Sequence, residues 1–202
     1  MFFEAWMSFF IFAAIITTVP GPGCILTINH ALQHGWRSSR MLILGQELAV
    51  FIIMITVTFG IKVISEIPHL ILIIKVLGVS WLIYSAWSAW NSPYNDLPIN
   101  AIPEASKLGR FIKGFVTDIT NGKALALFVS VVPSWIDIKY PVYLQATIMT
   151  VTMIVVDTIV LLFYSILCSR LRLLFKTPKF VKIQNRVSAV ILLLVAVKII
   201  YY

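Results

Sequence analysis

Charged residues are scarce in this chain. They make up 12% of its 202 residues, whereas a soluble domain carries about 25%. Hydrophobic residues make up 60%, and the mean hydropathy is +0.96. A globule of this size cannot hide so many apolar side chains from water, because its surface would have to be mostly apolar as well. The composition therefore excludes a water-soluble domain and predicts a membrane protein.

Acidic residues are the scarcer of the two charge types. Eight Asp and Glu stand against sixteen Lys and Arg, which gives a formal net charge of +8. In a soluble protein this excess would suggest nucleic-acid binding, but in a membrane protein it is explained by loops that lie against an anionic membrane face. We therefore predict a lipid bilayer, and no nucleic acid, as a partner.

Cysteine and histidine are rare, and their spacing offers no cofactor site. Cys24 and Cys168 lie far apart in apolar runs, which excludes a disulfide framework, a redox pair and a zinc site. His30 and His34 have a metal-compatible spacing, but no third ligand is nearby, so no metal is predicted. The chain also lacks a phosphate-binding glycine loop, a nucleophile elbow and an HExxH motif. We predict a protein that is not an enzyme, has no cofactor and does not itself use ATP.

Six apolar runs are present, and each is long enough to cross the membrane as a helix of about 20 residues. Strands of a β-barrel would instead alternate over about ten positions, and these runs are continuously apolar. The first run starts early, with Glu4 and no basic segment before it, so we expect it to remain in the mature protein. We predict an all-α polytopic membrane protein with spans at residues 3–32, 41–61, 68–90, 111–136, 140–167 and 181–202.

One long polar stretch, residues 91–110, separates the third run from the fourth. Pro93, Pro98 and Pro103 recur within it, so no regular helix can run through it. We predict a linker between two three-helix repeats, residues 1–90 and 111–202. Because each repeat has an odd number of spans, the second enters the membrane from the opposite side, and the repeats are inverted.

The first span of each repeat carries helix-breaking residues near its middle. The first break is Pro-Gly-Pro-Gly from residue 20, and the second is Asn-Gly-Lys from residue 121, which is 101 residues later. A single kink is common in membrane helices, but matched breaks in two repeats point to a substrate site at their interface. We predict a substrate site formed by Pro20, Gly21, Pro22, Gly23, Asn121, Gly122 and Lys123.

The basic residues are distributed unequally between the two sides of these six spans. Four lie on one side: Lys62, Lys75, Lys139 and Lys198. Eleven lie on the other: Arg37, Arg40, Lys107, Arg110, Lys113, Arg170, Arg172, Lys176, Lys179, Lys182 and Arg186. The positive-inside rule places the eleven in the cytoplasm, together with the linker, and both termini outside.

Lys123 lies deepest in the membrane, near the middle of the fourth span. A charge inside a span costs about 2.5–3.5 kcal/mol on insertion scales, so it is expected to face a cavity or another charge. The break before Lys123 should leave backbone amides free at the positive end of a new half-helix. Together these groups would suit a carboxylate. Alternatively, Lys123 pairs with Asp118 or Asp157 and only holds the bundle together.

Three acidic residues inside the spans are candidates for proton coupling. Asp157 lies in a run of Met, Ile, Val and Leu, where a carboxylate is hard to keep ionised unless Lys123 is close. It could therefore bind and release a proton during a transport cycle. Glu47 and Asp118 are the further candidates. Threonines just before the breaks are expected to satisfy freed carbonyls, namely Thr17, Thr18, Thr117 and Thr120.

Nearly the whole chain resembles the LysE/RhtB family of bacterial amino-acid exporters. The Pro-Gly-Pro break followed by a His-Gly-x-Arg turn is similar to the family's first-helix signature, and Asn-x-Lys-Ala is similar to its fourth-helix motif. The resemblance rests on Val19–Pro22, Leu32–Arg37, Gly78–Trp87, Phe111–Phe115, Asn121–Ala124, Phe128, Pro133, Asp157 and Arg170–Arg172.

The chain also departs from the family pattern. Gly23 stands where asparagine is common, Gly122 stands where proline is usual, and Glu47 is an unusual acid. In the second span a glycine pair is reduced to Gly45, with Ala49 in the other place. Gly122 can still break a helix, so the mechanism is expected to be kept. The changes at Gly23 and Glu47 mean that the substrates need not be the usual ones.

The resemblance implies a secondary transporter of the bacterial cytoplasmic membrane that exports small amino acids or related metabolites by proton antiport. An exporter of divalent cations is an alternative from the same superfamily, but it would need acids without a central cation. A membrane scaffold or assembly factor that transports nothing is another, but it would not need matched helix breaks. A monomer and a homodimer are both compatible with the sequence.

Overall fold

A computed structural model describes residues 3–67, 69–91, 104–137, 139–170 and 178–201. Within these ranges all regular secondary structure is helical, which confirms the predicted fold class. The elements are α1 (Phe3–Thr18), α2 (Pro22–His34), α3 (Trp36–Glu66), α4 (Leu70–Asn91), α5 (Lys107–Ile119), α6 (Gly122–Val131), the 3₁₀ helix η1 (Val132–Trp135), α7 (Val142–Arg170) and α9 (Pro178–Tyr201).

Six membrane spans result when each bent helix pair is counted as one. The helices α3, α4, α7 and α9 each contain a segment that is long and apolar enough to cross a bilayer. Helices α1 and α2 are bent by 53° at the first break, and α5 is bent by 51° from the segment Gly122–Trp135 at the second. The predicted six spans, with breaks in the first and the fourth, are therefore confirmed.

The predicted linker, residues 91–110, is partly helical at both of its ends. Asn91 is the last residue of α4, and Lys107 to Arg110 form the first turn of α5, with Ser106 capping the helix by accepting a hydrogen bond from the amide of Gly109. Residues 92–103, with the three prolines of the predicted linker, lie outside the described residues.

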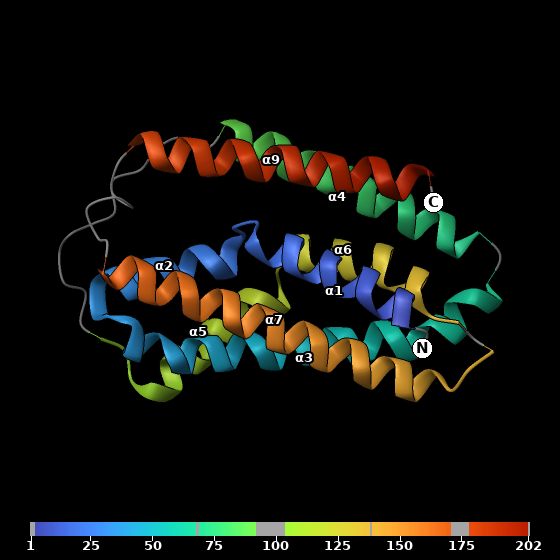
Figure 1. Cartoon of the computed structure of the whole chain (residues 1–202), viewed down its shortest axis with the longest axis horizontal. Helices are drawn as coiled ribbons and strands as arrows, with labels where there is room; N and C mark the ends of the chain where they lie inside the picture. Colours follow the sequence, from blue (N-terminus) through green and yellow to red (C-terminus); the bar gives the residue numbers. More distant parts are fainter. Residues whose placement is uncertain (1–2, 68, 92–103, 138, 171–177, 202) are drawn as a thin grey trace.

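The order of a bent pair followed by two long helices occurs twice along the chain. Helix α3 packs against α2, α5 and α7, while α4 pairs with α9 and also contacts α6. Figure 1 shows α4 and α9 side by side along one face of the bundle, with both termini at the same end. Large apolar side chains such as Leu77 and Trp87, 64% and 65% exposed, lie on the outer surface, as lipid contact requires.

Small residues allow the backbones of α3 and α5 to touch. A Cβ atom at Gly45 would overlap the carbonyl oxygen of Phe111, and one at Gly114 would overlap the carbonyl oxygen of Leu42. Membrane helices use small residues in this way because van der Waals packing, rather than exclusion of water, holds them together. The glycine kept at position 45 therefore has a packing role.

Replacing Gly45 with alanine is expected to destabilise the protein by about 1–3 kcal/mol, because the new methyl group must push two helix backbones apart. The measurement is the thermal unfolding midpoint in detergent. Gly109→Ala is the matched control, because a Cβ atom there would meet only the side chains of Ser106 and Ala105, at 3.3 Å and 3.6 Å. Equal midpoints for the two variants would contradict this role of Gly45.

Candidate substrate site at the two helix breaks

The two helix breaks meet inside the bundle. The Nζ atom of Lys123, at the start of α6, donates a hydrogen bond to the carbonyl oxygen of Val19, at the end of α1, over 2.7 Å. A Cβ atom built on Gly21 would lie 3.4 Å from Cδ of Lys123. Residues 104 positions apart in sequence are thus in direct contact, and the break residues of both repeats share one site.

Side chains from three other helices satisfy carbonyls at the first break. Besides Lys123 of α6, Tyr164 of α7 donates its hydroxyl hydrogen to the carbonyl of Thr18 over 2.9 Å. Gln46 of α3 donates through Nε2 to the carbonyl of Gly23 over 2.8 Å and accepts from the hydroxyl of Thr27. A break in a membrane helix needs such partners, because hydrocarbon offers none.

Three of the four threonines near the breaks donate to carbonyls of their own helix. Thr17 and Thr18 donate to the carbonyls of Ala14 and Ile15, and Thr120 donates to the carbonyl of Val116. These are bonds to the preceding turn of the same helix, a pattern that tends to bend helices. The carbonyl of Val116 also accepts from the amide of Thr120, so the predicted role of satisfying a freed carbonyl is not confirmed at Thr120.

The second break differs from the prediction, because its amides are not free. The side-chain oxygen of Asn121 accepts hydrogen bonds from the amides of Lys123 and Ala124, at 3.2 Å and 3.4 Å. Asparagine is a strong N-cap residue and uses the first free amides of the helix itself. The prediction of free amides beside Lys123 was therefore wrong for α6.

The uncapped helix start lies at the first break instead. Gly21 precedes α2 and has no side chain with which to cap it. A Cβ atom on Gly23 would overlap the carboxylate of Asp118, so this acid lies directly against the first turn of α2. The amide side chain of Asn121 donates to the same carboxylate, to Oδ1 over 3.3 Å. The positive end of α2 thus already faces a negative group of the protein.

A cavity of about 70 Å³ lies between the breaks. Of the predicted site residues, it is lined by Gly21, Gly23, Asp118, Asn121, Lys123 and Asp157. Pro20, Pro22, Gly122 and Glu47 are not in its lining. Gly122 instead packs against the ring of Trp81, which leaves no room for a Cβ atom. The volume suits a few water molecules.

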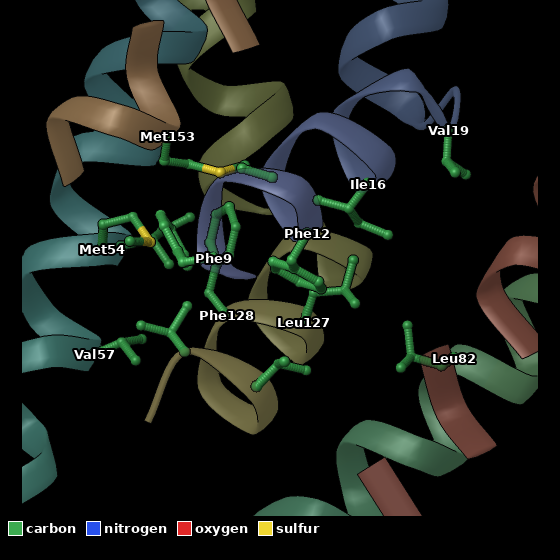
Figure 2. Packing of buried hydrophobic residues seen from close by; sticks show 14 of the residues in the cluster. Phe9, Phe12, Ile16, Val19, Met54, Val57, Leu82, Leu127, Phe128 and Met153 are labelled. Atoms are coloured by element: carbon green, nitrogen blue, oxygen red, sulfur yellow. The ribbon is translucent and has the colours of Figure 1, made fainter. Parts of the chain in front are cut away.

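Apolar side chains pack on both sides of the cavity. Towards the termini, Phe9 and Phe12 of α1 pack with Leu127 and Phe128 of α6, as Figure 2 shows. Towards the opposite end, Cys24 and Ile28 of α2 pack with Ile43 of α3, Leu161 and Cys168. The polar groups of the site therefore lie between two apolar clusters of the bundle.

Acidic groups outnumber basic groups around the cavity. Lys123 lies within electrostatic range of Asp118 and Asp157, yet it makes no ion pair with either. In the described parts of the chain, the one ion pair joins Arg110 and Glu104, near the end of the bundle opposite the termini. The geometry thus does not support the alternative that Lys123 only serves as half of a structural ion pair. Glu47 is buried between α3 and α7, behind the cavity wall.

The two histidines do not form a metal site. His30 shares a hydrogen bond of 2.7 Å with the hydroxyl of Ser38, and its ring lies 4.8 Å from that of His34. Within the ranges described, no three His, Cys, Asp or Glu side chains are placed to hold a metal ion.

Gln46 and Tyr164 are the residues that reasoning from the sequence missed. Gln46 is fully buried and stands next to Glu47 in an apolar run, so its polarity was an available signal. Tyr164 resembles any aromatic residue of a membrane helix, and only the folded structure brings its hydroxyl to the first break.

Comparison with known proteins identifies the family. A family model described as LysE type translocator matches residues 14–202. A homoserine/homoserine lactone efflux protein of Salmonella typhi is 27% identical over 96% of this chain and 95% of its own length. The membrane protein YrhP of Bacillus subtilis, which is uncharacterized, is 24% identical over 89% of this chain and 90% of its own length. A cysteine/O-acetylserine efflux protein of Escherichia coli (strain K12) is 27% identical over 48% of this chain and 50% of its own length. No solved structure matches the chain.

The chain belongs to the family of LysE type translocators. It is a multi-pass protein of the bacterial inner membrane with the function of an exporter, and it acts on a small molecule. Membership in a family of transporters is consistent with a protein that is not an enzyme.

Proposed function

We propose that the protein exports small amino acids or related metabolites from the cytoplasm in exchange for protons. The hydrogen bond from Lys123 to the carbonyl of Val19 carries this proposal, because it joins both breaks beside one cavity that charged side chains line. Transporters with inverted repeats bind their substrates at such discontinuous helices. The relatives support the substrate class, since one is named for homoserine and another for cysteine and O-acetylserine.

In the proposed cycle, Lys123 holds the carboxylate of the substrate. Its ammonium group has three donors, and in the described structure one of them is used by Val19. The first turn of α2 adds amides that no side chain caps. Asp157, on the opposite wall, takes up a proton from outside when the substrate leaves, which makes the exchange an antiport.

The proposed orientation places the positively charged end of the bundle in the cytoplasm. Arg37, Arg110 and Lys113 lie near the starts of α3 and α5, with Arg170 at the end of α7. These helix ends lie together, at the end of the molecule away from the termini (Figure 1). Of the eleven basic residues counted on this side, Arg172 and Lys176 lie outside the described residues. We further propose that residues 1–90 and 111–202 are inverted repeats.

The test is transport by the purified protein in liposomes with an imposed pH gradient and a panel of labelled amino acids. Small polar amino acids are expected to accumulate on the side from which protons leave, and dissipating the gradient should abolish accumulation. A protein that moves none of the panel, with or without the gradient, would overturn the proposal.

A further inference from the structure

Glu47 has a carboxyl group without hydrogen-bond partners in the interior of the bundle. The residue is 7% exposed, and both carboxyl oxygens are buried. Neither oxygen accepts a hydrogen bond from any group that the structure describes. The neighbouring Gln46, by contrast, has hydrogen-bond partners for both its oxygen and its nitrogen.

The ionisable groups that act on Glu47 are acidic. From α7, Asp157 is within electrostatic range of Glu47, and Thr158 lies beside it without meeting the geometry of a hydrogen bond. From α5, Asp118 is within electrostatic range. Lys123 of α6 acts on Asp118 and Asp157 rather than on Glu47, and the thiol of Cys24 on α2 lies near Asp157. Three carboxyl groups therefore lie near one another, and Lys123 serves only two of them.

To be stable in the interior of the bundle, these neighbouring carboxyl groups need a proton or an additional positive charge. A buried carboxylate with no donor is strongly disfavoured, and a second carboxylate beside it makes the ionised form costlier still. This free-energy cost is removed either by a proton on the carboxyl pair or by a ligand that brings a cation with N–H donors. An ammonium group does the latter, and every free amino acid carries one.

We propose that Glu47 and Asp157 together recognise the ammonium group of the substrate, and that a proton and this ammonium group occupy the pair alternately. The inference rests on the proposed function and assigns the second half of the substrate: Lys123 serves the carboxylate, and the acid pair serves the ammonium. Val50, one helical turn after Glu47, and Asp157 itself line the cavity, so the pair adjoins the space where substrate would bind.

Alternate occupancy also explains how exchange would be coupled. The proton and the ammonium group compete for the same oxygens, so both cannot be carried in the same direction at once. Recognition of the ammonium further predicts which ligands are accepted. A compound with an ammonium but no carboxylate should still bind, whereas an N-acylated amino acid should not depend on Glu47.

The experiment measures binding of three probes by the full-length protein in nanodiscs: serine, serine methyl ester and N-acetylserine. Glu47→Gln keeps the shape of the side chain but removes its charge. It is expected to weaken binding of serine and of the methyl ester by about tenfold to a hundredfold, the usual effect of losing a hydrogen bond to a charged group. N-acetylserine should bind equally to both proteins. The conservative variant Glu47→Asp should restore part of the affinity.

A matched control is Glu4→Gln, which removes an exposed acid from the first turn of α1. Methyl ester binding that is unchanged in Glu47→Gln, with wild-type protein binding normally, would overturn this inference and leave the proposed function intact. Wild-type protein that binds neither serine nor any other amino acid would instead overturn the proposed function. If Glu47→Gln does not fold, the test of alternate occupancy is the pH dependence of methyl ester binding by the wild-type protein. Binding that is independent of pH would refute alternate occupancy.

Discussion

Replacing Lys123 with methionine is expected to reduce transport by about a hundredfold or more while the protein still inserts into the membrane. Methionine fills a similar volume but cannot donate to the carbonyl of Val19, and it leaves the substrate carboxylate without a cation. Removing one partner of a buried, hydrogen-bonded charge typically costs about 2–5 kcal/mol, which corresponds to this loss. Lys123→Arg should restore only part of the activity, because the planar guanidinium is larger than an ammonium group.

The measurement is the initial rate of amino-acid transport in proteoliposomes that contain equal amounts of each variant. Lys139→Met is the matched control, since this lysine is exposed in the loop before α7. Wild-type rates in Lys123→Met would show that the lysine has only a structural role.

Replacing Asp157 with asparagine is expected to separate substrate movement from proton movement. Asparagine keeps the size of the side chain but cannot bind and release a proton. The variant should still bind substrate, although more weakly because Glu47 alone then holds the ammonium group, and it should still exchange labelled for unlabelled substrate at saturating concentrations. It should not accumulate substrate when a pH difference is imposed, so the accumulation ratio should fall to about one, the value set by passive equilibrium.

Both quantities are measured in the same preparation of proteoliposomes, with and without a pH gradient. Glu4→Gln again serves as a control, and it should leave exchange and accumulation unchanged. If Asp157→Asn retains full accumulation, the coupling carboxyl lies elsewhere, and Glu47 is the next residue to test.

Much of the architecture follows from the sequence because a bilayer restricts the available structures. Backbone polar groups in hydrocarbon must form their hydrogen bonds within a helix, so each membrane span requires a continuous apolar run in the sequence. The six predicted spans are found when each bent helix pair is counted as one. The breaks are equally readable, because Pro20 and Pro22 have no amide hydrogen to donate and Asn121 favours a helix start.

Other features depend on which segments meet in space, and the tertiary structure alone decides these. No local rule indicates that Lys123 reaches the carbonyl of Val19, or that Tyr164 donates to Thr18. Spacing along one helix likewise does not reveal that Glu47 lacks a partner, because its nearest charged neighbour belongs to another helix.

The sequence by itself therefore determined the fold class, the spans and the places where helices break, since these depend on residues close together in the chain. The tertiary structure decided how the breaks are combined into one site, which carbonyls find donors and that the carboxyl group of Glu47 is left without a donor. Those outcomes depend on contacts between segments about a hundred residues apart, such as that of Lys123 with Val19. Such contacts are set by the packing of whole helices rather than by local residue preferences.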